Sequence, residues 1–141
     1  MFDELNKYKK HGHFFFRATD SVEEVCNAPD SGHGVCIIYE LKLGRVELVY
    51  IGGSGSPKKK EYDGIKDFIL NGKSFSTPRS KSWAVKILAE NIHALDVYWW
   101  ITDDNKNNDD PWEVELDLLD LYIDVNDELP RWNSIPSKKR K

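Results

Sequence analysis

The sequence has little cysteine and no long apolar run, and these two absences exclude several classes of protein. Only two of its 141 residues are cysteine, too few and too widely spaced for a zinc module or a disulfide scaffold. No apolar stretch approaches the roughly 18 residues that a membrane-spanning helix needs. The first residues also lack the charged-then-apolar layout of a secretory signal. We therefore expect a soluble protein of the reduced cytoplasm that has no membrane partner.

The sequence lacks internal repeats, yet it has enough apolar residues to build a core. Hydrophobic residues make up 40% of the chain and aromatic residues 12%, which excludes disorder along its whole length. The length is about that of one ordinary domain. We expect an N-terminal strand and helix extension over residues 1–33, a principal domain over 34–133 and a basic tail over 134–141.

Charge is unevenly distributed, although the formal net charge is only −4. Residues 103–128 contain eleven acidic side chains and one lysine, whereas residues 58–86 contain eight basic side chains and three acids. A basic segment can face nucleic-acid phosphates, although runs of charge are more often simply solvated. Because the acidic segment would repel DNA, we expect any duplex to approach from the 58–86 side.

Hydrophobic patterning predicts three main strands. Residues 35–41 and 46–51 are rich in β-branched side chains and are separated by a short connection, which indicates an antiparallel hairpin. Residues 94–101 are aromatic and β-branched, as is typical of a third strand. Phe14–Phe16 reads as a further short strand in the N-terminal extension. The expected fold is an α/β (α+β) domain with a small central antiparallel three-stranded sheet flanked by helices.

Helices are expected both before and after the 94–101 strand in the sequence. Apolar residues at helical spacing predict a helix over 63–70 and another over 82–92. A long helix over 111–126 has Asp110 as its N-cap and proline in its first turn. Asp20 or Ser21 can cap a brief helix near the N-terminus, and Ser21 has capping-box spacing to Glu24.

Glu115 is the most informative residue of the long helix. At about 100° per residue, one face of the helix is apolar and the opposite face acidic. Glu115 projects at the edge of the apolar face, where a carboxylate loses solvation unless a donor, a cation or a metal compensates it. The structural alternative is a rim glutamate that bends to water or pairs with a lysine or arginine. The apolar face consists of Val114, Leu118, Leu121, Tyr122 and Val125.

Four features together resemble the GIY-YIG nuclease superfamily. Gly34-Val35-Cys36 lies where the family has its Gly-Ile-Tyr strand, and Tyr50-Ile51-Gly52 matches the second signature literally. A helix with basic surroundings follows, and Glu115 is similar to the family's metal-binding glutamate. The resemblance covers about residues 34–126, and the closing Leu129–Asn133 run is similar to a bacterial branch of single-domain members.

The resemblance implies a DNA endonuclease that hydrolyses phosphodiester bonds with one Mg²⁺ or Mn²⁺ ion, and a homodimer if both strands are cut. It implies that Tyr50 activates the attacking water, that Glu115 binds the metal and that Lys66 or Arg79 serves the phosphate. A hard cation of this kind keeps several waters and needs few protein ligands. The implied substrate-binding residues are Gly52, Gly53, Lys58, Lys59, Lys60 and Lys73.

Two positions depart from the family pattern and leave an alternative open. Cys36 stands where the first signature has tyrosine, and Phe68 stands where this branch has an arginine on the following helix. Tyr39 is expected on the opposite face of its strand from Cys36, so it does not replace the missing phenol. The alternative is a catalytically impaired domain of the same fold that only binds nucleic acid or a protein partner. A third hypothesis is a soluble α/β domain whose resemblance is architectural only.

Overall fold

The computed structural model describes residues 2–55, 61–74, 77–104 and 106–133, with the backbone alone at 73 and 74. The basic tail and the side chains of Lys58, Lys59, Lys60 and Lys73 lie outside what is described. Within the described part of the chain, no helix is both long enough and apolar enough to cross a bilayer.

A four-stranded antiparallel sheet in the order β1-β6-β2-β3 forms the centre of the molecule. The predicted hairpin and third strand are confirmed, and so is the α+β class. The sheet has four strands rather than three because the Phe14–Phe16 segment extends back to His11 and pairs with β6. The strands are β1 (His11–Phe16), β2 (His33–Lys42), β3 (Arg45–Gly53) and β6 (Ala94–Asp103).

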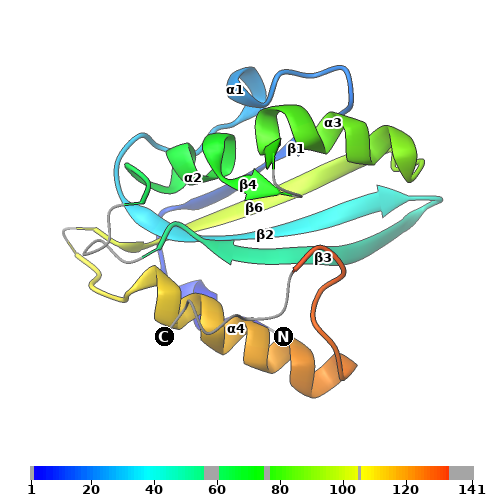
Figure 1. The fold of residues 1–141 in the computed structure, drawn as a ribbon. Coiled ribbons are helices and arrows are strands. Elements are labelled where there is room, and N and C mark those ends of the chain that lie inside the picture. The colour runs from blue at the N-terminus through cyan, green and yellow to red at the C-terminus, as the bar shows by residue number, and fades with distance from the viewer. Residues whose placement is uncertain (1, 56–60, 75–76, 105, 134–141) are drawn as a thin grey trace.

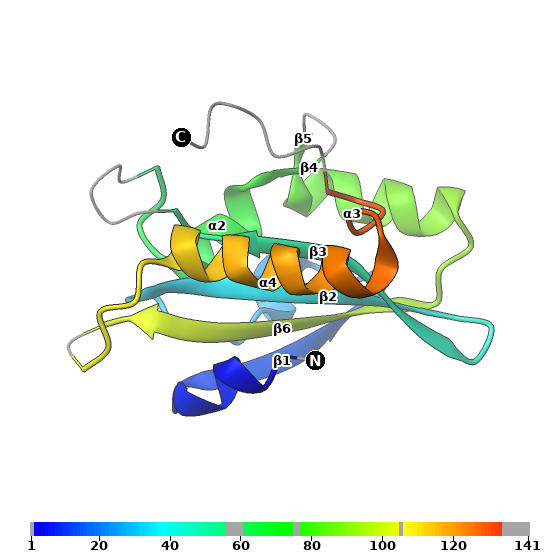
Figure 2. The same ribbon diagram turned by 90° about the horizontal axis from the view of Figure 1, so that it is seen from below.

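Helices cover both faces of this sheet (Figure 1). Helices α1 (Val22–Val25), α2 (Ile65–Asn71) and α3 (Arg79–Ala89) lie on one face, and α4 (Pro111–Asn126) lies on the other. The short 3-10 helix η1 (Asp3–Lys7) shares the face of α4 (Figure 2). A two-stranded ribbon of β4 (Lys73–Ser74) and β5 (Thr77–Pro78) joins α2 to α3.

Strand alternation produces two cores, one on each face of the sheet. The larger core lies under α1, α2 and α3 and includes Trp83, which is fully buried. The smaller core lies under α4 and η1 and includes Leu5 and Leu118. Each fully buried apolar side chain of this size stabilises the fold by about 1.5–3 kcal/mol. The two cores fix α3 and α4 on opposite faces of the sheet.

The predicted N-caps are confirmed. The Asp110 side chain accepts a hydrogen bond from the backbone N–H of Trp112, and the Ser21 hydroxyl accepts one from Glu24. The apolar face of α4 differs from the prediction at its C-terminal end, where Leu121 is 36% exposed and Val125 is 64% exposed. The buried apolar side chains of α4 lie between Pro111 and Leu119, in the N-terminal part of the helix.

Candidate functional site

Tyr50 lies near the end of β3 on the face that α2 and α3 cover. It pairs with Ile38 across the hairpin and packs against the larger core. A register shift beside this pair leaves Val49 without a partner on β2, so Val49 and Tyr50 both reach the same core. A Cβ atom on Gly52 would lie 2.5 Å from the Tyr50 hydroxyl oxygen. The glycine therefore gives the Tyr50 ring the space in which it lies.

Arg79, the first residue of α3, donates hydrogen bonds to Tyr50 and to the backbone of α2. Its guanidinium lies 3.0 Å from the Tyr50 hydroxyl oxygen and 2.6 Å from the carbonyl oxygen of Phe68. The guanidinium carbon also sits 4.4 Å from the centre of the Phe68 ring, a cation–π contact. A Cβ atom on Gly72 would collide with the Arg79 guanidinium. Gly72 and Phe68 thus shape the slot that holds Arg79.

Arg79 is only 1% exposed, and its contacts are with neutral groups. None of the ion pairs between described residues includes it, and its Nε has no hydrogen-bond partner in this part of the structure. Burial of a charge without a counter-charge is costly. A buried guanidinium of this kind favours negative charge on the atoms it touches, and the Tyr50 oxygen is one of them.

Glu115 lies on α4 and reaches the same end of β3 from the opposite face. It is 4% exposed, and a Cβ atom on Gly53 would lie 3.1 Å from its Oε1. Two consecutive glycines of β3 therefore accommodate Tyr50 on one face and Glu115 on the other. The two side chains therefore lie on opposite faces of β3, which is an edge strand of the sheet.

The donor set at Glu115 fits a hard divalent cation. Among the residues that the structure describes, no group of three or more His, Cys, Asp or Glu side chains is positioned to hold a metal. A zinc-type or calcium-type cage is thus not present there. Mg²⁺ is often bound through one or two carboxylates, with waters and substrate phosphate completing the shell. The single carboxylate of Glu115, which is buried against Gly53, is compatible in number with that mode.

The structure brings together some of the predicted residues and separates others. Tyr50 and Arg79 are in direct contact, and Glu115 lies beside Gly53, which follows Gly52. Lys66 instead forms an ion pair with Asp30, at 3.5 Å between Nζ and Oδ1. The structure therefore places Arg79, and not Lys66, on the tyrosine.

Cys36 occupies the same face as Tyr50 but cannot supply a phenol's chemistry. It pairs with Gly52 across the hairpin and is 1% exposed. Burial raises the pKa of its thiol to about 11, so the thiol is protonated at neutral pH. Tyr39 packs against the other core, as strand alternation predicts.

The Leu129–Asn133 segment holds the outer edge of β3 next to Tyr50. The Asn133 side chain accepts a hydrogen bond from the Ile51 N–H and donates one to the Ile51 carbonyl, at 3.0 and 2.8 Å. The Trp132 N–H donates to the carbonyl of Val49 at 2.8 Å. These bonds flank Tyr50 on both sides along the chain. No sequence pattern pointed to them, because an asparagine after a helix has no signature for pairing with a strand.

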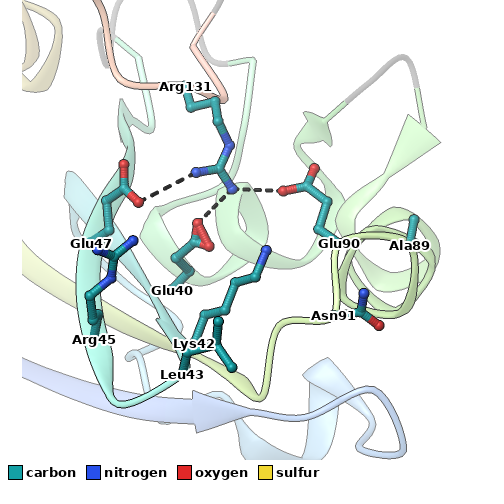
Figure 3. A pocket seen from close by; sticks show the side chains of 9 residues that line it. All are labelled: Glu40, Lys42, Leu43, Arg45, Glu47, Ala89, Glu90, Asn91 and Arg131. Carbon is teal, nitrogen blue, oxygen red and sulfur yellow. Dashed lines mark hydrogen bonds and ion pairs between the residues drawn. The ribbon is translucent and has the colours of Figure 1, made fainter.

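Arg131 anchors this segment through three glutamates that line a pocket of about 520 Å³ (Figure 3). Its Nη2 lies 2.6 Å from Oε1 of Glu40 and 2.6 Å from Oε1 of Glu90. Its Nη1 lies 3.7 Å from Oε2 of Glu47. We call this group the Arg131 clasp. It links β2, β3 and the end of α3 to the segment that lies against Tyr50.

The chain was compared with models of protein families, with curated proteins and with solved structures, and no match was found in any of the three.

Proposed function

We propose that this protein is a GIY-YIG-like endonuclease that hydrolyses phosphodiester bonds of DNA with one divalent metal ion. The observation that carries the proposal is the buried Arg79, which lacks a carboxylate partner among the described residues and donates to the Tyr50 hydroxyl. A buried cation on a tyrosine oxygen is expensive for stability. It is useful where negative charge develops during a reaction.

Tyr50 is the group that meets the substrate in this proposal. It is partly exposed, whereas Arg79 is buried behind it. The guanidinium orients the phenol and favours its ionised form, which has released its own proton to solvent. The phenolate oxygen then takes a proton from the attacking water. Water then adds to phosphorus as the bond to the leaving oxygen breaks, and that oxygen is protonated from solvent. Arg79 is therefore a positioning residue that acts through Tyr50.

Arg79 also bears on position 68, where the sequence departs from the family pattern. Where the resemblance expects an arginine on α2, this chain has Phe68, and the Arg79 guanidinium lies over the ring of Phe68. A guanidinium from α3 thus stands above the position from which the family's arginine would extend. Arg79 could therefore take the role of the arginine that is missing at position 68, which supports the proposal that the protein cleaves DNA.

Glu115 would hold Mg²⁺ or Mn²⁺ in this site. When bound, such an ion stabilises charge on a phosphoryl oxygen as a Lewis acid. The absence of a side chain at Gly53 gives the Glu115 carboxylate its place against the strand, where a Cβ atom would lie 3.1 Å from Oε1.

The acidic and basic segments of the sequence lie on different elements. Helix α4 carries five of the eleven acidic residues of the 103–128 segment, and it lies across the sheet from α2 and α3 (Figure 1). The basic 58–86 segment includes α2 and most of α3, while Lys58, Lys59, Lys60 and the side chain of Lys73 lie outside the described residues. We propose that a duplex approaches on the α2 and α3 side through its phosphates.

A domain that binds nucleic acid without cleaving it is the second candidate. The burial of Glu115 and the protonated, buried thiol of Cys36 favour it, because both reduce the groups available for chemistry. The proposed endonuclease differs from this candidate in needing Tyr50 and Glu115 for turnover.

Plasmid nicking in Mg²⁺ or Mn²⁺ tests the proposal directly. We expect nicking by the wild type, and a loss of about 10²-fold or more in Tyr50→Phe, the range of general acid–base contributions. Glu115→Ala should abolish nicking, whereas Glu113→Ala should not, because Glu113 is exposed on the same helix. Equal cleavage by wild type and Glu115→Ala, prepared identically, would reveal a contaminating nuclease and overturn the assignment.

Arg79→Met separates function from stability in the same assay. Replacement of a buried charge by an apolar side chain of similar length is often neutral or stabilising. We expect unchanged or higher resistance to urea together with strongly reduced nicking. If no variant nicks duplex, single-stranded or branched DNA but a gel shift shows binding that weakens with salt, the binding-only candidate replaces the endonuclease.

A further inference from the structure

A larger pocket lies on the opposite face of the sheet from Tyr50, between α4 and η1. Its volume is about 760 Å³, and its floor consists of residues of β2, β3 and β6. Figure 2 shows α4 and η1 on the same face, with β6 and β2 between them. The proposed nuclease chemistry does not use this pocket.

Five aromatic side chains line this pocket: Phe2, Tyr39, Tyr98, Trp100 and Tyr122. Each is partly exposed, so part of each ring is open to solvent. The rings of Tyr98 and Trp100 are stacked at 6.0 Å, and Tyr39 meets Tyr98 edge-on at 5.6 Å. Residues 98 and 100 share a face because strand side chains alternate. The result is a set of ring faces and edges around one cavity.

The charged groups of the pocket are acidic. Asp3, Glu47 and Asp96 line it, and no lysine, arginine or histidine is among the described residues that do. Asp96 is 8% exposed and lies 2.7 Å from Nδ1 of His13, which stacks on the far side of Tyr98. Glu47 is shared with the Arg131 clasp at 3.7 Å. Acidic residues of α4 add further negative charge on this face.

We infer that this pocket binds a small organic cation, with a quaternary or tertiary ammonium head and an apolar body. A ring quadrupole attracts a cation over its face, and several rings around one site form the aromatic cage that recognises such heads. The carboxylates attract positively charged ligands and repel phosphates, so we do not expect a nucleotide to bind in this pocket.

The protonation of the tyrosines is consistent with this role. Burial, with nearby carboxylates adding to it, raises the pKa of the Tyr98 and Tyr122 hydroxyls, and burial with the neighbouring Tyr98 and Asp96 raises that of Tyr39. The phenols therefore stay neutral through the physiological range, and their hydroxyl groups remain available as hydrogen-bond donors.

Choline and its uncharged carbon analogue, dimethylbutanol, test the inference as a matched pair of equal shape. Titration of the wild-type protein is followed by calorimetry and by the indole N–H signal of Trp100 in NMR. We expect saturable binding of choline at least about tenfold tighter than that of the alcohol, as one desolvated cation–π site supplies. Equal binding of both compounds, or binding of neither, would overturn the inference.

Two tryptophan variants locate the site. Trp100→Leu removes a ring of the cage and should abolish choline binding, whereas Trp112→Leu changes a similarly half-buried tryptophan outside the pocket and should leave it intact. If Trp100→Leu does not fold, the choline and alcohol titrations of the wild type still test the inference, because they need no variant. Trp112→Leu then shows whether a tryptophan outside the pocket affects binding. Concentration-dependent dimerisation that shifts the Trp100 signal without ligand would assign the pocket to a second copy of the chain and overturn the inference.

Discussion

At the scale of single residues, Arg79 shows how an unfavourable side chain is kept in place by its neighbours. Phe68 supplies both a carbonyl oxygen at 2.6 Å and a ring at 4.4 Å. The Phe68 carbonyl also accepts a hydrogen bond from the Gly72 N–H at 2.8 Å. The Arg79 guanidinium thus binds a carbonyl oxygen of α2 and the Tyr50 hydroxyl at the same time. A residue placed so specifically, without a counter-charge among the described carboxylates, is more readily explained by chemistry than by stability.

Gly72→Ala should displace Arg79 from its slot. The added methyl group would collide with the guanidinium and lie 2.5 Å from the Phe68 carbonyl oxygen. Overpacking of this kind typically costs about 1–3 kcal/mol, so urea denaturation should show a lower free energy of unfolding and nicking should fall with it. Gly44→Asn is the control, because Gly44 has open space and a φ of 73° that asparagine tolerates. An alanine variant as stable and as active as the wild type would show that Arg79 does not need its slot.

Sequence patterns identify Arg79 as a candidate phosphate-binding cation, but they do not predict its contact with Gly72. Their contact depends on the β4 and β5 ribbon, which returns the chain to the end of α2. Two-residue strands carry no periodicity, so residue patterns alone could not predict that return.

At the scale of elements, sequence patterns predicted the strands and helices whose formation depends on neighbouring residues. The β2 and β3 hairpin, β6 and the capped helix α4 follow from β-branched runs and from N-cap chemistry. The place of β1 beside β6 did not follow, since its register joins residues about 80 to 90 positions apart along the chain. The same holds for the bonds between Asn133 and Ile51, which are 82 positions apart. Long-range pairing depends on the assembled core and leaves no short motif.

Asn133→Ala should weaken the edge of β3. The variant loses both hydrogen bonds to Ile51, and two such bonds are together worth about 1–3 kcal/mol of stability. Chemical denaturation should show that loss, and hydrogen exchange should show reduced protection of the Ile51 amide. Asn133→Asp is the matched variant, because its carboxylate still accepts from the Ile51 N–H but has no donor for the carbonyl. We expect it to lie between wild type and alanine. If the two variants were indistinguishable from wild type, the segment would not hold β3.

At the scale of the whole molecule, two polar links tie the chain's ends to its middle. The Arg131 clasp joins the C-terminal segment to the sheet and α3. Tyr8, just after η1, donates a hydrogen bond of 2.5 Å to Asp109, in the loop before α4. Lys7 pairs with the same carboxylate at 3.2 Å. Both links use carboxylates whose ionised form is the one that binds.

Because of these links, the free energy of unfolding should depend on pH in the acidic range. Burial pushes the pKa of Glu90 upward, but hydrogen bonds from Lys86 and Arg131 outweigh burial and hold it below its ordinary value of 4.5. A carboxyl whose pKa is lower in the folded state contributes stability that is present above the unfolded pKa. That contribution is lost as the pH falls through the folded pKa. The fold should therefore weaken below about pH 4.3.

Tyr8→Phe tests this dependence at one bond. The hydrogen bond from Tyr8 is the largest cause that holds the pKa of Asp109 below its ordinary value of 3.8. Its removal should cost about 1 kcal/mol at pH 7, a modest figure because the Asp109 side chain is 45% exposed and solvent screens it. The difference between wild type and variant should shrink as the pH falls below the ordinary value, since protonated Asp109 no longer favours the folded state through its charge.

Urea denaturation of both proteins from pH 7 to pH 3 measures that difference, with Tyr62→Phe as the control. Tyr62 packs edge-on against Phe68 at 5.2 Å, and none of the hydrogen bonds found between described residues involves its hydroxyl, so its variant should track the wild type at every pH. A Tyr8→Phe deficit that stayed constant down to pH 3 would mean that the hydroxyl stabilises the fold by packing alone. A deficit that vanishes in acid would show that a charged bond between the chain's first turn and the loop before α4 holds that helix, and Glu115 with it, against β3.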